Sequence, residues 1–218
     1  MKLTRATLKD QALAVIRESM VSGEIRPGET YSAAGMAAKL GTSNGPVREA
    51  MLTLVEQGIM QVVPNVGFQI TPLTDGDLDE IYELRLMLEV PAMRRLAERG
   101  THGRDGEART HAERCARAAA EHDVKTFIAA DRDFHLALLE LVGNNRLAKF
   151  VATLRDQTRL YGLNLAGADQ LRASAAELTA LLDALRAGDA DRAEEIMTAH
   201  LGQVRDEWTV SDDAKVAG

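Results

Sequence analysis

Residues 41–58, GTSNGPVREAMLTLVEQG, constrain the fold most, because their chemistry changes along their length. The segment opens with small polar residues and then places apolar side chains every three or four positions. This pattern predicts a helix with Ser43 as its N-cap. After Gly58 the hydrophobic period changes to two, and residues 59–64 and 67–72 are typical of the two short strands of a hairpin. The first part of the chain must therefore join a polar-tipped helix to a hairpin.

Two further helical patterns precede this pair. Residues 7–23 have an amphipathic pattern that ends at a glycine, and residues 33–40 form a second, short helix capped by Ser32. Gly41 breaks that short helix, so a tight turn joins it to the next one in a helix-turn-helix arrangement. A hairpin directly after such a unit is a wing. The sequence therefore predicts a winged helix-turn-helix domain over residues 1–72.

The rest of the chain carries hardly any strand signal. Pro72 and the TDGD segment indicate a hinge, and the helical pattern that follows is interrupted at segments such as VGNN and AGDAD. Short loops favour an antiparallel bundle over residues 73–210, with residues 211–218 as a flexible tail. The predicted fold class is mainly α, and the bundle has six helices at about 74–99, 105–121, 123–142, 145–165, 168–187 and 189–208.

Charge and composition exclude several classes of protein. No run of eighteen apolar residues is present, the start lacks the apolar stretch of a signal peptide, and the single cysteine, Cys115, rules out an internal disulfide. These features predict a cytoplasmic protein with no membrane partner. The net charge is −7, but residues 1–70 hold seven Lys/Arg against six Asp/Glu, whereas residues 71–218 hold nineteen against twenty-seven. Only residues 1–70 could therefore face the phosphates of a nucleic acid. Their excess of positive charge is small, which favours binding of the nucleic acid by two copies of the chain.

The polar leading end of the helix after Gly41 can enter the major groove of double-stranded DNA. Phosphate contacts are expected from basic side chains near it, and backbone or minor-groove contacts from the hairpin tip. A small protein-docking module is the alternative for this domain. The predicted DNA-binding residues are Arg26, Lys39, Ser43, Asn44, Gly45, Arg48, Asn65 and Gly67.

The bundle carries titratable side chains on faces that are otherwise apolar. Asp131 and His135 lie four residues apart on one predicted helix, and His200 lies on the inner face of the last helix. Buried singly, such groups are costly, so they are either hydrogen-bonded core residues or ligands of a metal ion. Arg85 is likewise a charged residue on an apolar helix face. It either binds a carboxylate of an effector or forms an ion pair with Glu89 one turn away.

Two sets of residues resemble known regulator families. The segments IRPGE, LGTSNGPVREAM and LVEQGIMQVVPNVGF, within residues 8–72, resemble the DNA-binding domain of the GntR transcriptional regulators. The segments LRLMLE, DRDFH, GNNRL and AGDADRAEEIMTAH, within residues 73–208, resemble the FCD ligand-binding domain of the FadR-like subgroup. The resemblance implies a homodimeric winged-helix regulator, usually a repressor, that a small organic acid releases from its operator.

The sequence departs from the DNA-binding pattern of these regulators at positions that normally contact DNA. Relatives usually carry arginine at the position of Asn44 and a charged pair at the position of Ala33-Ala34, whereas Arg48 is retained. Asparagine pairs well with adenine and replaces arginine poorly on guanine. We therefore expect docking on DNA to survive and the base preference to shift away from guanine.

A second departure falls in the bundle. Metal-binding FCD domains look like an aspartate with three histidines, and Asp131, His135 and His200 match three of these positions, but Leu178 stands at the fourth. Either a three-ligand site for a divalent ion such as Zn, Ni or Mn remains, or the metal is lost and the cavity is more apolar. In the first case the organic acid would bind the metal, and in both cases Arg85 is a candidate partner for its carboxylate.

An enzyme is the alternative from another functional class. Two histidines and one carboxylate are also the ligand set of non-haem iron oxygenases. However, those sites normally lie on β-barrels, and the chain has no glycine-rich phosphate loop and no GxSxG motif. The expected function is therefore transcription regulation and not catalysis.

Overall fold

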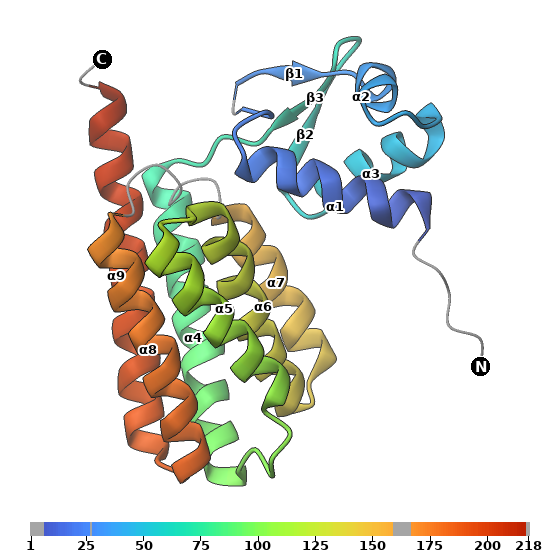
Figure 1. The fold of residues 1–218 in the computed structure, drawn as a ribbon. Helices are drawn as coiled ribbons and strands as arrows, with labels where there is room; N and C mark the ends of the chain where they lie inside the picture. Colours follow the sequence, from blue (N-terminus) through green and yellow to red (C-terminus); the bar gives the residue numbers. More distant parts are fainter. Residues whose placement is uncertain (1–6, 27, 159–166, 217–218) are drawn as a thin grey trace, which may run out of the picture. The chain divides into compact units, whose positions relative to one another are not determined.

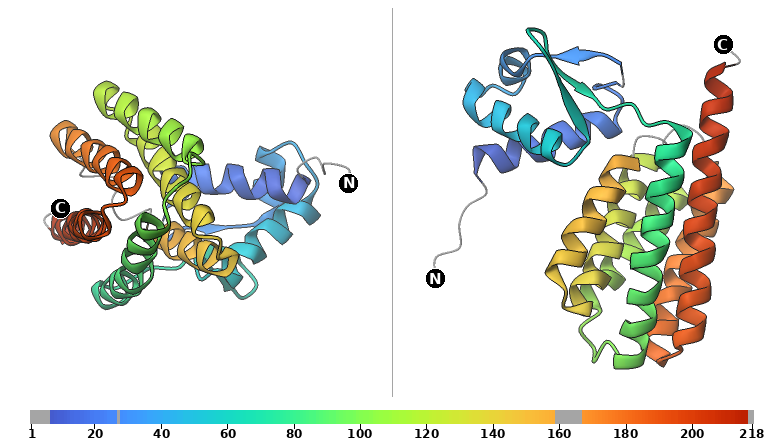
Figure 2. Two further views of the ribbon diagram at one scale, coloured as in Figure 1. Left: turned by 90° about the horizontal axis from the view of Figure 1, so that it is seen from below. Right: turned by 180° about the vertical axis from the view of Figure 1, so that it is seen from behind.

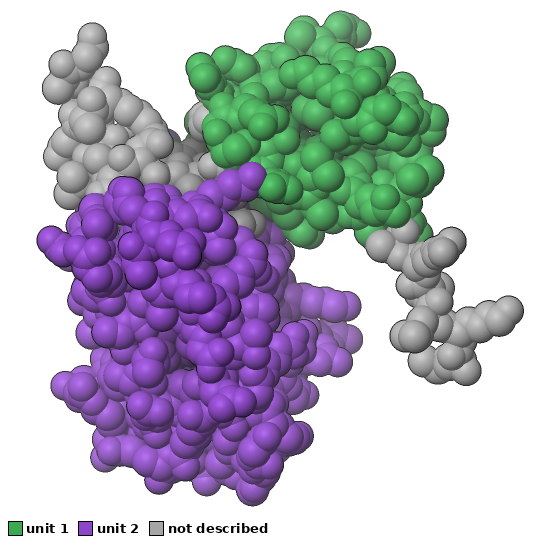
Figure 3. All heavy atoms as spheres, viewed as in Figure 1, with its two compact units in different colours: residues 1–73 green, residues 74–218 purple. Residues whose placement is uncertain are grey.

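The computed structural model describes residues 7–26, 28–158 and 167–216 of the 218-residue chain. Figure 1 shows the order of the helices and strands. The chain divides into two compact units, Met1–Leu73 and Thr74–Gly218, which Figure 3 shows in two colours. This division falls one residue beyond the boundary that the sequence predicts.

The first unit is a winged helix-turn-helix, as predicted. Helix α1 begins after Thr7, whose side chain accepts a hydrogen bond from the Asp10 amide in a capping box, and α2 begins after Ser32, which caps it through the Gly35 amide. The described elements of this unit are α1 (Leu8–Val21), β1 (Thr30–Tyr31), α2 (Ala33–Lys39), α3 (Asn44–Glu56), β2 (Met60–Val63) and β3 (Gly67–Ile70).

A small antiparallel sheet forms the wing, with strand order β1-β3-β2. Strands β2 and β3 are the predicted hairpin, with Val62 opposite Phe68. Strand β1 was not predicted, because two residues are too few to show a period of two. Gly67 lies where β3 passes β1: its φ is +154°, and a Cβ atom there would collide with the backbone of Tyr31. Glycine is therefore required for the sheet to form.

Burial of one face of α3 fixes which of its side chains can meet a ligand. Val47, Ala50, Met51 and Leu54 are all fully buried. Full burial of a valine, leucine or methionine side chain stabilises the fold by about 1.5–3 kcal/mol. The opposite face, which includes the first turn, stays exposed to solvent.

The described part of the second unit forms the predicted six-helix bundle. Figures 1 and 2 show the helices running alongside one another. Its core includes the fully buried Phe134 and Leu138 of α6 and Leu178 of α8. No helix among the described residues is long and apolar enough to span a membrane. The bundle helices are α4 (Asp75–Arg99), α5 (Gly106–Glu121), α6 (Val124–Val142), α7 (Asn145–Thr158), α8 (Ala168–Ala187) and α9 (Ala190–Val216).

Two predicted helix ends differ from the structure or cannot be compared with it. Helix α7 is described as far as Thr158, so the predicted continuation over residues 159–165 lies outside the described residues. The last helix does not end at 208: α9 continues to Val216, through most of the segment predicted to be a tail. Residues 203–216 contain neither glycine nor proline, so nothing in this stretch breaks the helix.

Candidate functional site

The first turn of α3 presents the polar residues expected to meet DNA. Ser43 holds the N-cap position, but its side chain makes no capping hydrogen bond, which leaves the hydroxyl available to a ligand. Asn44 and Gly45 follow and are exposed. A Cβ atom added to Gly45 would meet nothing within 4 Å, so the helix surface is open there. This turn can approach a nucleic-acid groove closely.

Arg48, one turn further along α3, is exposed and lies against the wing. Its guanidinium carbon is 5.9 Å from the centre of the Phe68 ring in β3. Such a cation–π contact favours a subset of the side chain's rotamers. Arg48 is therefore partly positioned before it meets a ligand.

The other predicted DNA-binding residues lie in other elements of the first unit. Lys39 is exposed in the last turn of α2, and Arg26 is exposed with its Nε donating to the Gly23 carbonyl at 3.0 Å. Asn65 takes a left-handed conformation, φ +60°, in the turn between β2 and β3. Gly67 is the first residue of β3, is half-buried and pairs with Val63. Its role in the structure is to allow the close approach of two strands.

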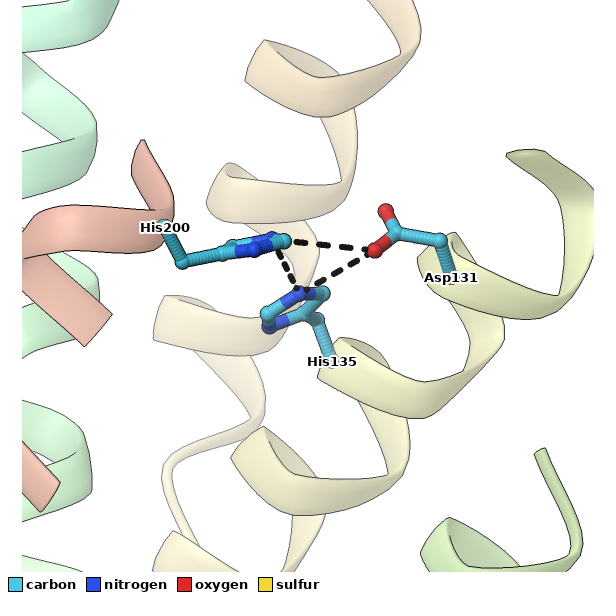
Figure 4. Close-up of side chains that lie close together, drawn as sticks. All are labelled: Asp131, His135 and His200. Atoms are coloured by element: carbon cyan, nitrogen blue, oxygen red, sulfur yellow. Dashed lines mark hydrogen bonds and ion pairs between the residues drawn. The ribbon is translucent and has the colours of Figure 1, made fainter. Parts of the chain in front are cut away.

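Inside the bundle, the structure brings three of the predicted ligands together. Asp131 and His135 project from α6 and His200 from α9, and the three side chains converge (Figure 4). His135 Nε2 lies 3.2 Å from His200 Nε2 and 3.4 Å from Asp131 Oδ1, and His200 Nε2 lies 3.7 Å from the same oxygen. One potential ligand atom from each side chain fits within a span of 4.8 Å. This spacing suits a single ion.

The residues present fit a divalent metal. Asp131 Oδ1 is buried, and among the described residues it has no hydrogen-bond partner. An orphaned buried carboxylate oxygen is costly unless something binds it. Two imidazole nitrogens and one carboxylate oxygen form a common ligand set for first-row divalent metals. The cluster formed by Asp131, His135 and His200 is called the triad below.

Glu177 of α8 orients one of the triad histidines. Its Oε2 lies 3.0 Å from His200 Nδ1. A carboxylate can only accept here, so His200 donates from Nδ1, and Nε2 is the ring nitrogen that faces the triad. This role of Glu177 was not predicted from the sequence. The neighbouring Leu178 is 1% exposed and belongs to the apolar core.

A buried ion network joins the triad to α4. Arg155 of α7 donates from Nε and Nη2 to Glu89 Oε2, at 3.0 and 2.5 Å, and from Nη1 to Asp131 Oδ2, at 3.3 Å. Arg85 Nε donates to the other Glu89 oxygen at 2.8 Å, so the predicted alternative of an Arg85–Glu89 ion pair is confirmed. The sequence prediction did not include Arg155 in the site. Its spacing from Val151 places it on the buried face of α7, together with Leu154, and this spacing could have identified it.

This network shifts the pKa values of Glu89 and of two triad residues, Asp131 and His135. Burial alone would raise the pKa of Glu89, but Arg155 and Arg85 lower it to about 2. Burial and the nearby Arg155 lower the pKa of His135 to about 4, so its ring is neutral near pH 7. Burial would likewise raise the pKa of Asp131, but the His135 ring and Arg155 hold it below its usual range. His135 and Asp131 are therefore in the forms that bind metals, a neutral imidazole and an ionised carboxylate.

Each of the two units matches a known protein family. Residues 8–70 match the model of the bacterial regulatory proteins of the gntR family, and residues 80–203 match the FCD domain. The probable D-xylose utilization operon transcriptional repressor of Paenarthrobacter nicotinovorans is 32% identical over 201 residues, which cover 92% of this chain and 88% of that protein. The Nta operon transcriptional regulator of Aminobacter aminovorans is 32% identical over 145 residues, or 64% of this chain and 66% of that protein.

Solved structures of other proteins share the fold of this chain. E. coli McbR/YncC superimposes with a TM-score of 0.81 at 26% identity, covering 91% of this chain and 95% of that one. A putative GntR regulator from Rhodococcus sp. RHA1 shares the fold, with a TM-score of 0.75 at 22% identity over 92% and 97% of the two chains. The two operon proteins are transcription regulators. The chain therefore belongs to the GntR family of bacterial transcriptional regulators, and its helical bundle is an FCD domain.

Proposed function

We propose that this regulator is a homodimeric repressor that a small organic acid, bound at the triad, releases from its operator. The observation that carries the proposal is the convergence of Asp131, His135 and His200 around a carboxylate oxygen that has no hydrogen-bond partner among the described residues. A divalent metal held there would supply coordination positions for carboxylate oxygens of the acid. The operator DNA of such a repressor lies in the cytoplasm.

Operator binding would use the exposed first turn of α3. Ser43, Asn44 and Arg48 would face base edges and phosphates, while Arg26, Lys39 and Asn65 would contact the backbone on either side. One domain carries little net positive charge, so affinity depends on two copies that bind two half-sites. A ligand that changes the spacing of the two domains would then release the DNA.

The bundle offers a route from the triad to the DNA-binding unit. Arg155 contacts both Asp131 of the triad and Glu89 of α4. Helix α4 begins at Asp75, directly after the segment that connects it to the winged helix. A ligand that displaces Asp131 or Arg155 would change the packing of α4 and so bias the bundle toward one arrangement.

Dimerisation would use an apolar face of α4 and α7, two helices in contact with each other. Leu84 and Met87 of α4 are 38% and 61% exposed, and Phe150 of α7 is 50% exposed. Exposed apolar side chains on two contacting helices are typical of a protein–protein interface, and a second copy of the chain would cover them.

Met87→Lys should weaken the dimer, because the charge would be desolvated in the apolar interface. We expect the dissociation constant to rise at least about tenfold, equivalent to about 1.4 kcal/mol. Light scattering coupled to gel filtration, run over a range of concentrations, measures this change. Val15→Lys, at a 39% exposed position of α1, is the matched control and should leave the dimer intact. Equal behaviour of the two variants would exclude this face.

Selection of binding sites from a random double-stranded DNA pool tests the proposal and the role of Asn44 together. The expected product is a palindrome of two half-sites, with adenine at the position that Asn44 meets. Asn44→Arg should change that adenine to guanine and leave the other positions unchanged, at about 1–3 kcal/mol of discrimination per half-site. No enrichment would contradict DNA binding by this domain, and an unchanged base would contradict the position given to Asn44.

A further inference from the structure

We propose that the wing tip, residues 62–66, reads the minor groove of the operator by exclusion. Its apolar side chains accept A·T base pairs next to each half-site and reject G·C pairs, and Val66 is the residue that decides between them. The inference rests on the proposed function, because it adds a specificity determinant to the same operator-binding domain. It does not depend on the ligand that the helical bundle binds.

The side chains of the wing tip are uncharged and mostly apolar. No Asp, Glu, Lys or Arg occurs between Glu56 and Asp75, a stretch that includes the whole β2–β3 hairpin. Val62 and Val66 are 52% and 59% exposed. Without a cationic side chain, the hairpin forms no ion pair with phosphates, the contact that dominates the affinity of most proteins for DNA. The wing tip therefore suits the sugars and base edges of a groove better than the phosphates.

The apolar surface of the wing continues to the helix that is expected to enter the major groove. Val62 of β2 lies directly opposite Phe68 of β3, so the two side chains share one face of the sheet. The Phe68 ring in turn lies 5.9 Å from the guanidinium carbon of Arg48 on α3. The hairpin and α3 thus belong to one surface of the domain (Figure 1). With α3 in the major groove, the hairpin beside it reaches the neighbouring minor groove, which is narrower.

The wing tip is held in one conformation before it meets DNA. The Val66 amide donates to the Val63 carbonyl at 3.1 Å, which closes a four-residue turn with Pro64 and Asn65 at its centre. Proline presets the first central position, and Asn65, with φ +60°, supplies the left-handed second position, as in a type II turn. Gly67 fixes the other side of the turn, because only glycine fits against β1 there. A preformed tip loses little conformational entropy when it enters a groove.

One chemical group distinguishes the two kinds of base pair in the minor groove. Both present acceptors there, and a G·C pair adds the amino group of guanine as a donor. The side chain of valine has no acceptor, so an amino group beneath Val66 would lose its water without gaining a hydrogen bond. An A·T pair has no such group, and the floor of its groove can approach the valine closely. Val66 therefore favours A·T by making G·C unfavourable.

Duplexes with altered purines test the proposal on the full chain. The starting duplex is the operator selected from the random pool, and 2,6-diaminopurine replaces adenine at each flanking A·T pair in turn. This base adds a minor-groove amino group and keeps the major-groove face of adenine. We expect one position per half-site at which the affinity of the wild type falls at least about tenfold. An inosine·cytosine pair, which lacks the amino group, should be accepted at that position.

Two variants assign the effect to a side chain. Val66→Ser supplies a hydroxyl that can accept from the amino group, and it should reduce the loss to about twofold or less. Val66 is exposed, so the fold should not change. Asn65→Gly is the matched control: it keeps the left-handed turn, removes the only polar side chain of residues 62–66 and should show the full loss.

Each outcome decides the proposal. It is overturned if the wild type tolerates diaminopurine at every flanking position. It is also overturned if Val66→Ser shows the same loss as the wild type, because the effect would then come from the shape of the DNA. A random pool that yields no enriched site would contradict DNA binding, and the proposal for the wing with it. An enriched operator that tolerates diaminopurine would contradict the proposal for the wing alone.

Discussion

Replacing Arg155 by methionine should lower the free energy of unfolding by about 3–5 kcal/mol, because it leaves buried carboxylates without their partner. Arg155 is 6% exposed and donates to Glu89 and Asp131 at once. Methionine keeps much of the side-chain volume but none of the hydrogen bonds. Arg85 still neutralises part of the charge on Glu89, so the bundle should fold, with reduced stability.

Urea denaturation followed by far-ultraviolet circular dichroism, at one protein concentration, measures this effect. Arg117→Met, at an exposed position of α5, is the matched control and should change stability by no more than about 0.5 kcal/mol. Adding Glu89→Gln to Arg155→Met should cost less than the sum of the two single changes, because the two residues are in contact. A loss below about 1 kcal/mol for Arg155→Met would contradict the buried network.

Arg48→Ala should weaken operator binding at least about thirtyfold. A contact by this side chain is worth about 1–3 kcal/mol, and a dimer makes it twice. The loss should appear without a change in stability, since Arg48 is exposed and its guanidinium contacts only the ring of Phe68 among the aromatic side chains described.

Fluorescence anisotropy on the selected operator, at fixed salt, measures the affinity. Arg117→Ala is the control: it removes one positive charge, as Arg48→Ala does, but from the helical bundle. It should leave the affinity for the operator within about twofold of the wild type. If Arg48→Ala bound as tightly as this control, the first turn of α3 would not be the part that reads DNA.

The elements with a long, regular pattern could be predicted from the sequence. Six amphipathic helices and a hairpin leave a clear periodicity, and all of them are present in the structure. Strand β1 is only two residues long and exists because Gly67 lets β3 approach it, which is a tertiary effect without a local signal. The end of α9 lies beyond the predicted residue 208, because chain ends are often frayed but nothing in residues 203–216 breaks a helix.

The triad could be found because its members interrupt apolar faces. Asp131 and His135 share one face of α6 through their spacing of four residues, and His200 interrupts the inner face of α9. The contacts of Arg155 and Glu177 with the triad could not be predicted, because arginine and glutamate are common on the exposed surfaces of helices. Only the packing of α7 against α4, and of α8 against α9, shows that they hold the triad in place.

The measurement that tests the account most directly is release of the operator by the ligand, made in parallel on the wild type and Asp131→Ala. Fluorescence anisotropy of labelled operator is followed while Ni²⁺ and citrate, a divalent metal and a small organic acid, are added. The account predicts that the wild type loses affinity at least about tenfold, while Asp131→Ala binds the operator equally well at the start and does not respond. An unresponsive wild type, or equal release of both proteins, would contradict a regulatory site at Asp131, His135 and His200.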